Sequence, residues 1–207
     1  MKTVFVDPER CIGCRQCEFA CAVEASISKD PIAALFEEPP PRTRIHVEAG
    51  PTMNTSYPNR CRHCDPAPCL QVCPTGAIAR DADEDLVLVD QTRCIGCAMC
   101  AIVCPFDAVT FHPAAASGNE HPVAITCDGC AHLVKQGLEP ACVAVCKVDA
   151  LVYGEINELI AERRLGDAAR ALDAVASTPN AAGSGSDSVD AWRGFGTEVK
   201  TIESREP

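Results

Sequence analysis

The chain has 207 residues, of which 47% are hydrophobic, 23% charged and only 4% aromatic, and its 18 basic and 29 acidic residues give a formal net charge of −11. Such an acidic chain is a poor nucleic-acid binder, because phosphate contacts need clustered lysine and arginine. Its apolar content excludes low-complexity disorder over most of its length. No run of about 20 apolar residues predicts a membrane-spanning helix. We expect no cleaved signal peptide, because the N-terminus lacks an apolar stretch.

Short strands are predicted beside cysteine-rich loops. The segments 3–6 and 86–89 lead into such a loop, and the segments 108–111 and 151–153 leave one. Apolar, β-branched residues in these segments favour strands. Short helical turns are expected after the fourth cysteine of each loop.

Residues 23–59 separate the first two cysteine-rich loops. They contain a proline-rich run at 37–41, which predicts a rigid loop, and a strand-like segment at 44–47. We interpret the whole stretch as a surface insertion that contacts a partner.

The C-terminal part of the chain differs in composition. Residues 155–177 have apolar side chains at helical spacing and predict a helix. A Gly- and Ser-rich linker follows, and beyond it the tail carries Trp192, the only tryptophan, and Phe195. Because aromatic side chains anchor interfaces, we expect the tail, 178–207, to dock on another subunit.

The sixteen cysteines fall into four groups of four, with none left over. The first and third groups have the spacing C-x2-C-x2-C-x3-C, the second C-x2-C-x4-C-x3-C and the fourth C-x2-C-x11-C-x3-C. In chain order the groups are Cys11, Cys14, Cys17 and Cys21; Cys61, Cys64, Cys69 and Cys73; Cys94, Cys97, Cys100 and Cys104; and Cys127, Cys130, Cys142 and Cys146.

Three kinds of chemistry compete for these thiols. Disulfides need an oxidising compartment, and three thiols crowded into one turn have poor disulfide geometry. Structural zinc favours two C-x2-C pairs closing one tetrahedron, whereas two groups here place three cysteines within seven residues. The spacing C-x2-C-x2-C-x3-C-P is that of bacterial two-cluster ferredoxins, in which the fourth cysteine ligates the other cluster. Pro74 and Pro105 supply such a proline, so the sequence predicts [4Fe–4S] clusters.

Sixteen thiolates divide into four [4Fe–4S] clusters with four ligands each. Groups two and three are adjacent and should form one module, and groups one and four then close a second module from both ends, as the simplest arrangement. Crossover ligation predicts four ligand sets. They are set I, Cys61, Cys64, Cys69 and Cys104; set II, Cys94, Cys97, Cys100 and Cys73; set III, Cys11, Cys14, Cys17 and Cys146; and set IV, Cys127, Cys130, Cys142 and Cys21.

The expected fold class is α+β. It consists of two bacterial-ferredoxin-like two-cluster modules with short β-hairpins and short helices, plus a C-terminal helix and an extended tail. The expected segments are 1–56, the first half of the outer module plus the insertion; 57–112, the inner module; 113–154, the second half of the outer module; 155–177, the helix; and 178–207, the flexible tail.

Over about residues 3–160 the sequence resembles the four-cluster ferredoxin-like subunits of multisubunit oxidoreductases. The most specific pieces are 61–69, CRHCDPAPC, and 137–142, GLEPAC. That family includes beta subunits of molybdenum or tungsten formate dehydrogenases and of dimethyl sulfoxide reductase-type enzymes. It also includes electron-transfer subunits of carbon monoxide dehydrogenases, hydrogenases and tungsten aldehyde oxidoreductases. The resemblance implies the same crossed ligand sets, and it departs from the family at Lys147, where Pro is common, and at Asp107 and Asp149, where Gly is usual.

No catalytic motif is visible, whether a Ser/His/Asp order, HExxH, a Walker loop or GxGxxG. We therefore interpret the chain as a non-catalytic electron-transfer component of anaerobic metabolism. It would relay electrons between a catalytic Mo-, W- or Ni-type subunit and a second subunit of the flavin, NAD(P)H or hydrogenase kind. The alternatives are a free soluble polyferredoxin and a structural zinc or disulfide protein. The expected location is cytoplasmic, with export alongside a signal-bearing partner left open.

Three side chains near the cysteines invite a functional interpretation. His63, between Cys61 and Cys64, could replace a thiolate as in Rieske centres, but four cysteines in every group favour a surface or loop-bonding role. Arg62 and Lys147 would raise a nearby cluster potential by their charge. We favour ordinary solvated cations, because exposed charges are screened.

Overall fold

The computed structural model describes residues 2–52, 55–113 and 121–176, and the chain divides into two units, residues 1–156 and 157–207. Within the described ranges the strands are β1 (Lys2–Val6), β2 (Ile45–Ala49), β3 (Ser56–Arg60), β4 (Ile78–Arg80), β5 (Val87–Val89), β6 (Thr110–His112), β7 (Val123–Ile125) and β8 (Leu151–Glu155). The helices are α1 (Gln16–Ala25), the 3-10 helix η1 (Ala33–Phe36), α2 (Pro68–Gln71), α3 (Met99–Ile102), α4 (Ala131–Lys135), α5 (Ala141–Ala144) and α6 (Ile156–Ala176).

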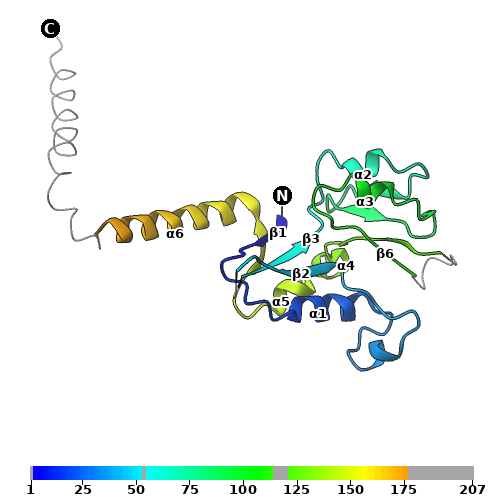
Figure 1. The fold of residues 1–207 in the computed structure, drawn as a ribbon, viewed down its shortest axis with the longest axis horizontal. Helices are drawn as coiled ribbons and strands as arrows, with labels where there is room; N and C mark the ends of the chain where they lie inside the picture. The colour runs from blue at the N-terminus through cyan, green and yellow to red at the C-terminus, as the bar shows by residue number, and fades with distance from the viewer. Residues whose placement is uncertain (1, 53–54, 114–120, 177–207) are drawn as a thin grey trace, which may run out of the picture. The chain divides into compact units, whose positions relative to one another are not determined.

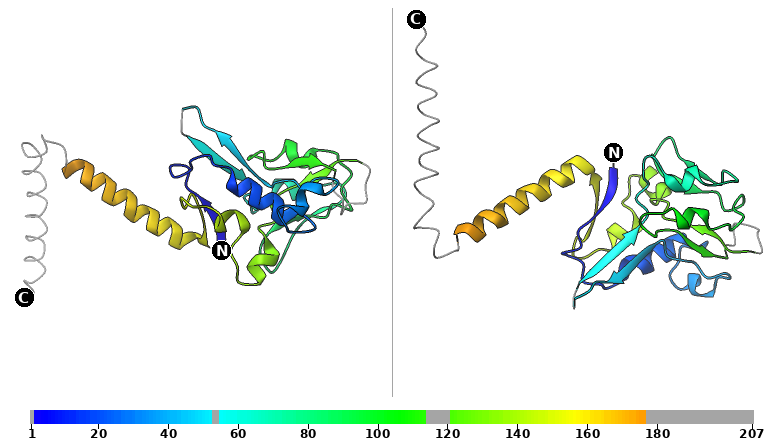
Figure 2. Two further views of the ribbon diagram at one scale, coloured as in Figure 1. Left: turned by 90° about the horizontal axis from the view of Figure 1, so that it is seen from below. Right: turned by 45° about the horizontal axis from the view of Figure 1, so that its top comes forward.

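The strands pair into two-stranded antiparallel sheets, β1 with β8, β2 with β3, β4 with β5, and β6 with β7. The strands expected from the sequence are found, with ends displaced by at most two residues. Small two-stranded sheets and short helices give an α+β fold of the kind found in ferredoxin-like domains, so the predicted fold class is confirmed at this level. Figure 2 shows the β2–β3 hairpin as a pair of cyan strands.

The β1–β8 sheet joins the beginning and the end of the first unit. Val4 lies opposite Tyr153, and Val6 lies opposite Leu151. Val4 and Leu151 are buried, so this pairing also closes a hydrophobic core. Segments about 150 residues apart in sequence therefore lie side by side.

Two hydrophobic cores form within the first unit, and cysteines are part of both. The inner core contains Ala67, Ala77, Ile78, Val87, Val123 and Ala124 together with Cys94 and Cys100. The outer core contains Val4, Ile45, Val47, Val143 and Leu151 together with Cys17 and Cys142. In Figure 1, α2 and α3 lie together in the part of the unit that holds the inner core, and α1 lies beside α5 in the other part. The inner core also takes in β7, which belongs to the expected segment 113–154.

The stretch between the first two cysteine groups is only partly a surface insertion. Ile45 on β2 is 1% exposed and packs in the outer core with Val47. Elsewhere in the stretch Ile32 and Phe36 are exposed, as expected, but Ser26, Ala34 and Pro58 are also buried. The apolar alternation of β2 buries one face of the strand, which explains why it joins the core.

In groups two, three and four a short helix occurs before the fourth cysteine, so the expectation that it follows is wrong there, whereas in group one α1 continues past the fourth cysteine, Cys21, to Ala25. The third cysteines Cys69, Cys100 and Cys142 lie on α2, α3 and α5, and these helices end before Cys73, Cys104 and Cys146. The x3 spacing places the third and fourth cysteines four residues apart, which is about one helical turn. The helical turn therefore forms between the two cysteines.

The second unit contains most of α6, which was expected at 155–177. The helix begins at Ile156 because Glu155 is the last residue of β8. In the described ranges we find no helix that is both long and apolar enough to cross a membrane. The tail with Trp192 and Phe195 lies outside the described residues.

Candidate functional site

All sixteen cysteines lie within the described residues, and all are free thiols. None is therefore engaged in a disulfide, contrary to what a disulfide scaffold requires. Cys14 and Cys97 are exposed, and the other fourteen are buried or partly buried. Thiols that are buried next to apolar side chains form the candidate site.

Two small apolar cavities lie next to the inner core, and four thiols line each of them. Cys61, Cys64, Cys69 and Cys104 line the first, together with Pro68, Ile78 and Val87. Cys73, Cys94, Cys97 and Cys100 line the second, together with Ile95, Met99 and Phe111. Cys69 and Cys73, four residues apart, thus line different cavities. In bacterial two-cluster ferredoxins the third and fourth cysteines of a group likewise serve different clusters.

The remaining thiols gather around the outer core. The thiol of Cys142 is close enough to those of Cys127, Cys21 and Cys130 for their charges to interact. Cys17 interacts in the same way with Cys11 and Cys14.

Cys146 packs against the same core as Cys11 and Cys17. The structure therefore brings cysteines from the two ends of the first unit into one region, as the β1–β8 pairing does for the backbone.

Burial raises the pKa of several of these thiols, whereas at Cys73 hydrogen bonds outweigh burial and lower the pKa. Desolvation raises the pKa of Cys17, Cys61 and Cys100 to about 11, and that of Cys130 to about 12, and repulsion from neighbouring thiolates acts in the same direction. These four thiols are therefore protonated at neutral pH when no metal is bound. The thiolate form becomes stable in these sites only when a cation binds, because the cation compensates the negative charge. Metal binding therefore releases the thiol protons.

The donor set fits an iron–sulfur cluster better than a single metal ion. Thiolates are soft ligands that suit zinc and iron–sulfur clusters. Zinc would need its four sulfurs at about 2.3 Å from one point. Among the described residues, no group of three or more His, Cys, Asp or Glu side chains converges so closely that it could hold one ion. A cluster of several irons spreads its ligands over separate corners and does not need that convergence.

A left-handed residue stands two positions after the first cysteine of every group. The four are Gly13 (φ 69°), His63 (φ 50°), Gly96 (φ 68°) and Gly129 (φ 65°). At two of them the turned backbone aims an amide at the preceding thiol, with His63 N to Cys61 Sγ and Gly129 N to Cys127 Sγ both 3.4 Å. Such N–H···S bonds are one means by which proteins tune a cluster's potential.

Two further amides reach thiols from outside the cysteine groups. The amide of Arg44 donates to Cys21 Sγ at 3.2 Å, and that of Ala124 donates to Cys94 Sγ at 3.4 Å. The Arg44 side chain also forms an ion pair with Asp128, next to Cys127. Sequence reasoning missed these contacts because residues 44 and 128 are far apart along the chain, and neither belongs to a motif.

His63 is half-buried and binds the backbone of strand β5, so it has neither the surface position nor the loop contact that was expected of it. Its Nδ1 accepts a hydrogen bond of 3.0 Å from the amide of Val87, while Nε2 is buried without a partner among the described residues. Burial, assisted by the charge of Arg60, lowers the pKa of His63 to about 4. The imidazole is therefore neutral at physiological pH, and Nδ1 is already engaged.

The cations near the cysteines differ in their surroundings. Lys147 is exposed, in agreement with the expected solvated cation. Arg62 differs from that expectation, because its guanidinium lies over the rings of Tyr57 and Phe106, at 5.7 and 5.6 Å from their centroids. It also lines the cavity of Cys61 and Cys104.

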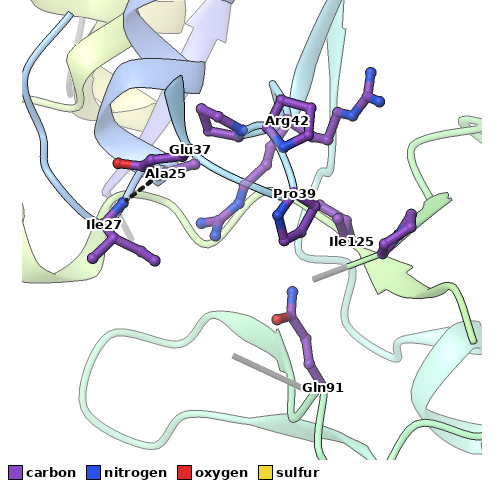
Figure 3. A pocket seen from close by; sticks show the side chains of 11 residues that line it. Ala25, Ile27, Glu37, Pro39, Arg42, Gln91 and Ile125 are labelled. Carbon is purple, nitrogen blue, oxygen red and sulfur yellow. Dashed lines mark hydrogen bonds between the residues drawn. The ribbon is translucent and has the colours of Figure 1, made fainter. Parts of the chain in front are cut away.

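A larger cavity, of about 140 Å³, has no thiol in its lining (Figure 3). Its lining includes Glu37, Pro39, Arg42 and Gln91 but no cysteine. The Glu37 carboxylate accepts a 3.0 Å hydrogen bond from the amide of Ile27, so it is used to hold the loop. We assign this cavity no chemistry.

The chain is similar to known iron–sulfur proteins. A family model described as a 4Fe-4S dicluster domain matches residues 53–156, and one described as a 4Fe-4S binding domain matches residues 3–26. The electron transport protein HydN of Escherichia coli is 38% identical over 173 residues, which cover 78% of this chain and 94% of HydN. The thiosulfate reductase electron transfer subunit PhsB of Salmonella typhi is 35% identical over 167 residues, which cover 77% of this chain and 79% of the relative.

A Halobacterium salinarum protein, named provisionally as an iron–sulfur subunit of a dimethyl sulfoxide reductase, is 32% identical over 175 residues. The match covers 74% of this chain and 65% of that relative, so the chain spans slightly less than two thirds of the relative's length.

Proposed function

Because this chain belongs to the 4Fe-4S dicluster family of iron–sulfur electron-transfer proteins, we propose that it binds four [4Fe–4S] clusters and relays electrons for a catalytic oxidoreductase subunit. The observation that carries the proposal is the pair of apolar cavities lined by four thiols each. Bound clusters would supply reversible electron transfer. The chain itself contributes ligands, amide hydrogen bonds to sulfur and walls that exclude water, and we propose no catalytic residue in it.

The proposed ligands are the four crossed sets. Set I is Cys61, Cys64, Cys69 and Cys104; set II is Cys94, Cys97, Cys100 and Cys73; set III is Cys11, Cys14, Cys17 and Cys146; and set IV is Cys127, Cys130, Cys142 and Cys21. Cavity lining supports sets I and II. The closeness of Cys142 to Cys127, Cys130 and Cys21 supports set IV, and that of Cys17 to Cys11 and Cys14 supports set III.

We infer that the four sites lie in single file, in the order III, IV, I, II. Cys17 of set III and Cys21 of set IV are one turn apart on α1. The charge of Cys127 in set IV acts on Cys61 in set I. The charge of Cys69 in set I acts on Cys100 in set II. Each neighbouring pair of sites thus has thiols close to one another, which favours electron transfer along the row.

The two ends of this row reach the surface. The exposed cysteines Cys14 and Cys97 belong to sets III and II, the two terminal sets. Exposed apolar side chains stand near each of them in the sequence, Ile12 and Phe19 near Cys14, and Ile95 and Ile102 near Cys97. Because exposed apolar patches mark interaction sites, we propose that electrons enter and leave through partners docked at these two ends.

The proposed partners are a catalytic oxidoreductase subunit and a second electron donor or acceptor, in cytoplasmic complexes. Relatives named as subunits of reductases support the first partner. The second candidate function is a free polyferredoxin. It is favoured by the net charge of −11, which suits a mobile, soluble carrier.

Anaerobic purification of the full-length chain from its native source tests the proposal. We expect about 16 iron and about 16 sulfide per chain, as four [4Fe–4S] clusters require, and co-elution with a larger catalytic subunit. Iron-loaded protein that elutes as a monomer supports the polyferredoxin instead. Zinc in place of iron contradicts both functions.

A further inference from the structure

Arg60 is a buried arginine beside a proposed cluster ligand. It is the last residue of β3 and directly precedes Cys61, and it is only 3% exposed. Arginine is almost never fully buried without a charged partner, because removing a charge from water costs much free energy. The position of Arg60 therefore needs an explanation.

The guanidinium contacts only neutral oxygen atoms. Its Nη2 donates to the carbonyl of Val4 at 2.5 Å and to Thr3 Oγ1 at 3.2 Å, and its Nη1 donates to the carbonyl of Cys61 at 3.1 Å. Its Nε is buried without a hydrogen-bond partner. None of the ion pairs among the described residues includes Arg60. The hydrogen bonds hold the group in place, and Glu84 and Asp85, which line the same small cavity as Arg60, form no ion pair with it.

The cysteine motif does not itself require a buried arginine. Arg10 and Arg93 occupy the equivalent position, directly before the first cysteine of groups one and three. The Arg10 side chain is 57% exposed and lies near Asp7 and Asp149. Arg93 is exposed and donates to the carbonyl of Thr75. Burial without an acidic partner therefore distinguishes Arg60 from these two equivalents.

Arg60 lies near two proposed cluster sites, one beside the inner core and one beside the outer core. Cys61, whose carbonyl it binds, belongs to proposed set I. Val4, whose carbonyl accepts from Arg60 Nη2, packs in the outer core that also contains Cys142 of proposed set IV, so the guanidinium lies beside that core as well. Sets IV and I are the middle pair of the proposed row, so an electron that crosses from one core to the other passes this charge.

We propose that Arg60 is the built-in countercharge of clusters IV and I and that it raises their reduction potentials. The inference rests on the proposed function, since only clusters in these sites would supply the missing negative charge. Each reduction adds one electron to a cluster, and the fixed positive charge stabilises that added charge without uptake of a proton. The effect is strong because the site is shielded from water.

Redox titration of the full-length, cluster-loaded protein, followed by electron paramagnetic resonance, tests this role. For Arg60→Gln we expect two of the four clusters to become harder to reduce. The ratio of reduced to oxidised cluster at a fixed potential should fall about tenfold, which equals a shift of about 59 mV for one electron. Arg60→Lys, which keeps the charge, should restore most of the potential. The matched control Arg10→Gln should leave all four potentials unchanged.

A second variant keeps the arginine and cancels its charge. Thr3→Glu places a carboxylate where Thr3 Oγ1 now accepts from Arg60 Nη2, and Thr3→Gln is its uncharged control. We expect Thr3→Glu to lower the same two potentials and Thr3→Gln to leave them unchanged. Thr3→Glu therefore tests the effect of the Arg60 charge even if Arg60→Gln does not assemble its clusters.

The countercharge is refuted if all four clusters assemble and their reduction potentials change in neither Arg60→Gln nor Thr3→Glu. The proposed function would then stand. Equal shifts in Arg10→Gln would also refute the countercharge, because an exposed arginine would then act like the buried one. A wild-type chain without iron–sulfur clusters would overturn the proposed function and this inference together.

Discussion

Left-handed backbone positions recur three residues after the last cysteine of a group. Gly76 follows Cys73 with φ 61°, Asp107 follows Cys104 with φ 49°, and Asp149 follows Cys146 with φ 52°. Asp107 and Asp149 are the two positions at which the sequence departs from the glycine that is usual in the family it resembles. Their positive φ explains the preference for glycine, which adopts such a backbone without steric cost. Aspartate is tolerated at positive φ but costs more than glycine.

Asp107→Gly should therefore stabilise the protein by about 1 kcal/mol, because it removes the steric cost of a left-handed side chain. Asp107 is exposed, so little packing is lost. Anaerobic thermal unfolding at one scan rate measures the effect. Asp83→Gly is a matched control, since Asp83 is exposed and is not among the residues with positive φ, and it should be neutral or slightly destabilising. A lower transition temperature for Asp107→Gly would contradict the prediction.

Helix α1 shows how one element serves two sites. Cys17 and Cys21 lie one turn apart on this helix, and α1 packs against α5, which carries Cys142. Cys17 is close to Cys11 and Cys14, whereas Cys21 is close to Cys127. The spacing of four residues keeps both thiols on the same side of the helix and offsets them by about 6 Å along its axis.

Serine variants of these three cysteines separate crossed from sequential ligation. Cys21→Ser and Cys142→Ser should perturb the same cluster, and Cys17→Ser a different one. The double variant Cys21→Ser/Cys142→Ser should then resemble either single variant, whereas Cys17→Ser/Cys21→Ser should lose two signals. Iron content and electron paramagnetic resonance under anaerobic conditions give the count. If Cys17→Ser and Cys21→Ser perturb one and the same cluster, the crossed sets are wrong.

Local elements were predicted unevenly from the sequence. Strands were found because alternating or continuous apolar residues next to turn residues specify them. The helical turns were misplaced, because four-residue helices carry too little periodicity to be recognised. The burial of Ile45 was also missed, since its proline-rich surroundings suggested a surface loop.

At the scale of the whole molecule, the two cores are small and include thiols. Aromatic residues make up only 4% of the chain, and the buried set consists mainly of Ala, Val, Ile and Cys. In the proposed holoprotein, clusters would tie α1 to α5 and α2 to α3 through the crossed ligands. Much of the stability of the first unit should therefore come from cluster binding.

Removal of iron by a chelator under reducing, anaerobic conditions should largely unfold the first unit. We expect loss of protease resistance and of β-sheet circular dichroism together with the visible absorbance. Reconstitution with iron and sulfide should restore all three. An apoprotein that keeps its protease resistance would contradict this dependence, and it would show that the apolar cores are sufficient for folding.

The sequence by itself determined the iron–sulfur chemistry, the electron-transfer family and the short-stranded α+β fold, because cysteine spacing and apolar patterning are local properties. Tertiary structure decided what depends on distant segments. Arg10, Arg60 and Arg93 look equivalent in the sequence, yet Arg60 is buried, with β1 supplying two of its hydrogen-bond acceptors. The ligand sets remain a prediction, but the shared cavities are a tertiary finding. The burial of Arg60 and the shared cavities both depend on contacts between segments that are far apart in the sequence. The path of the whole backbone determines which of these segments meet.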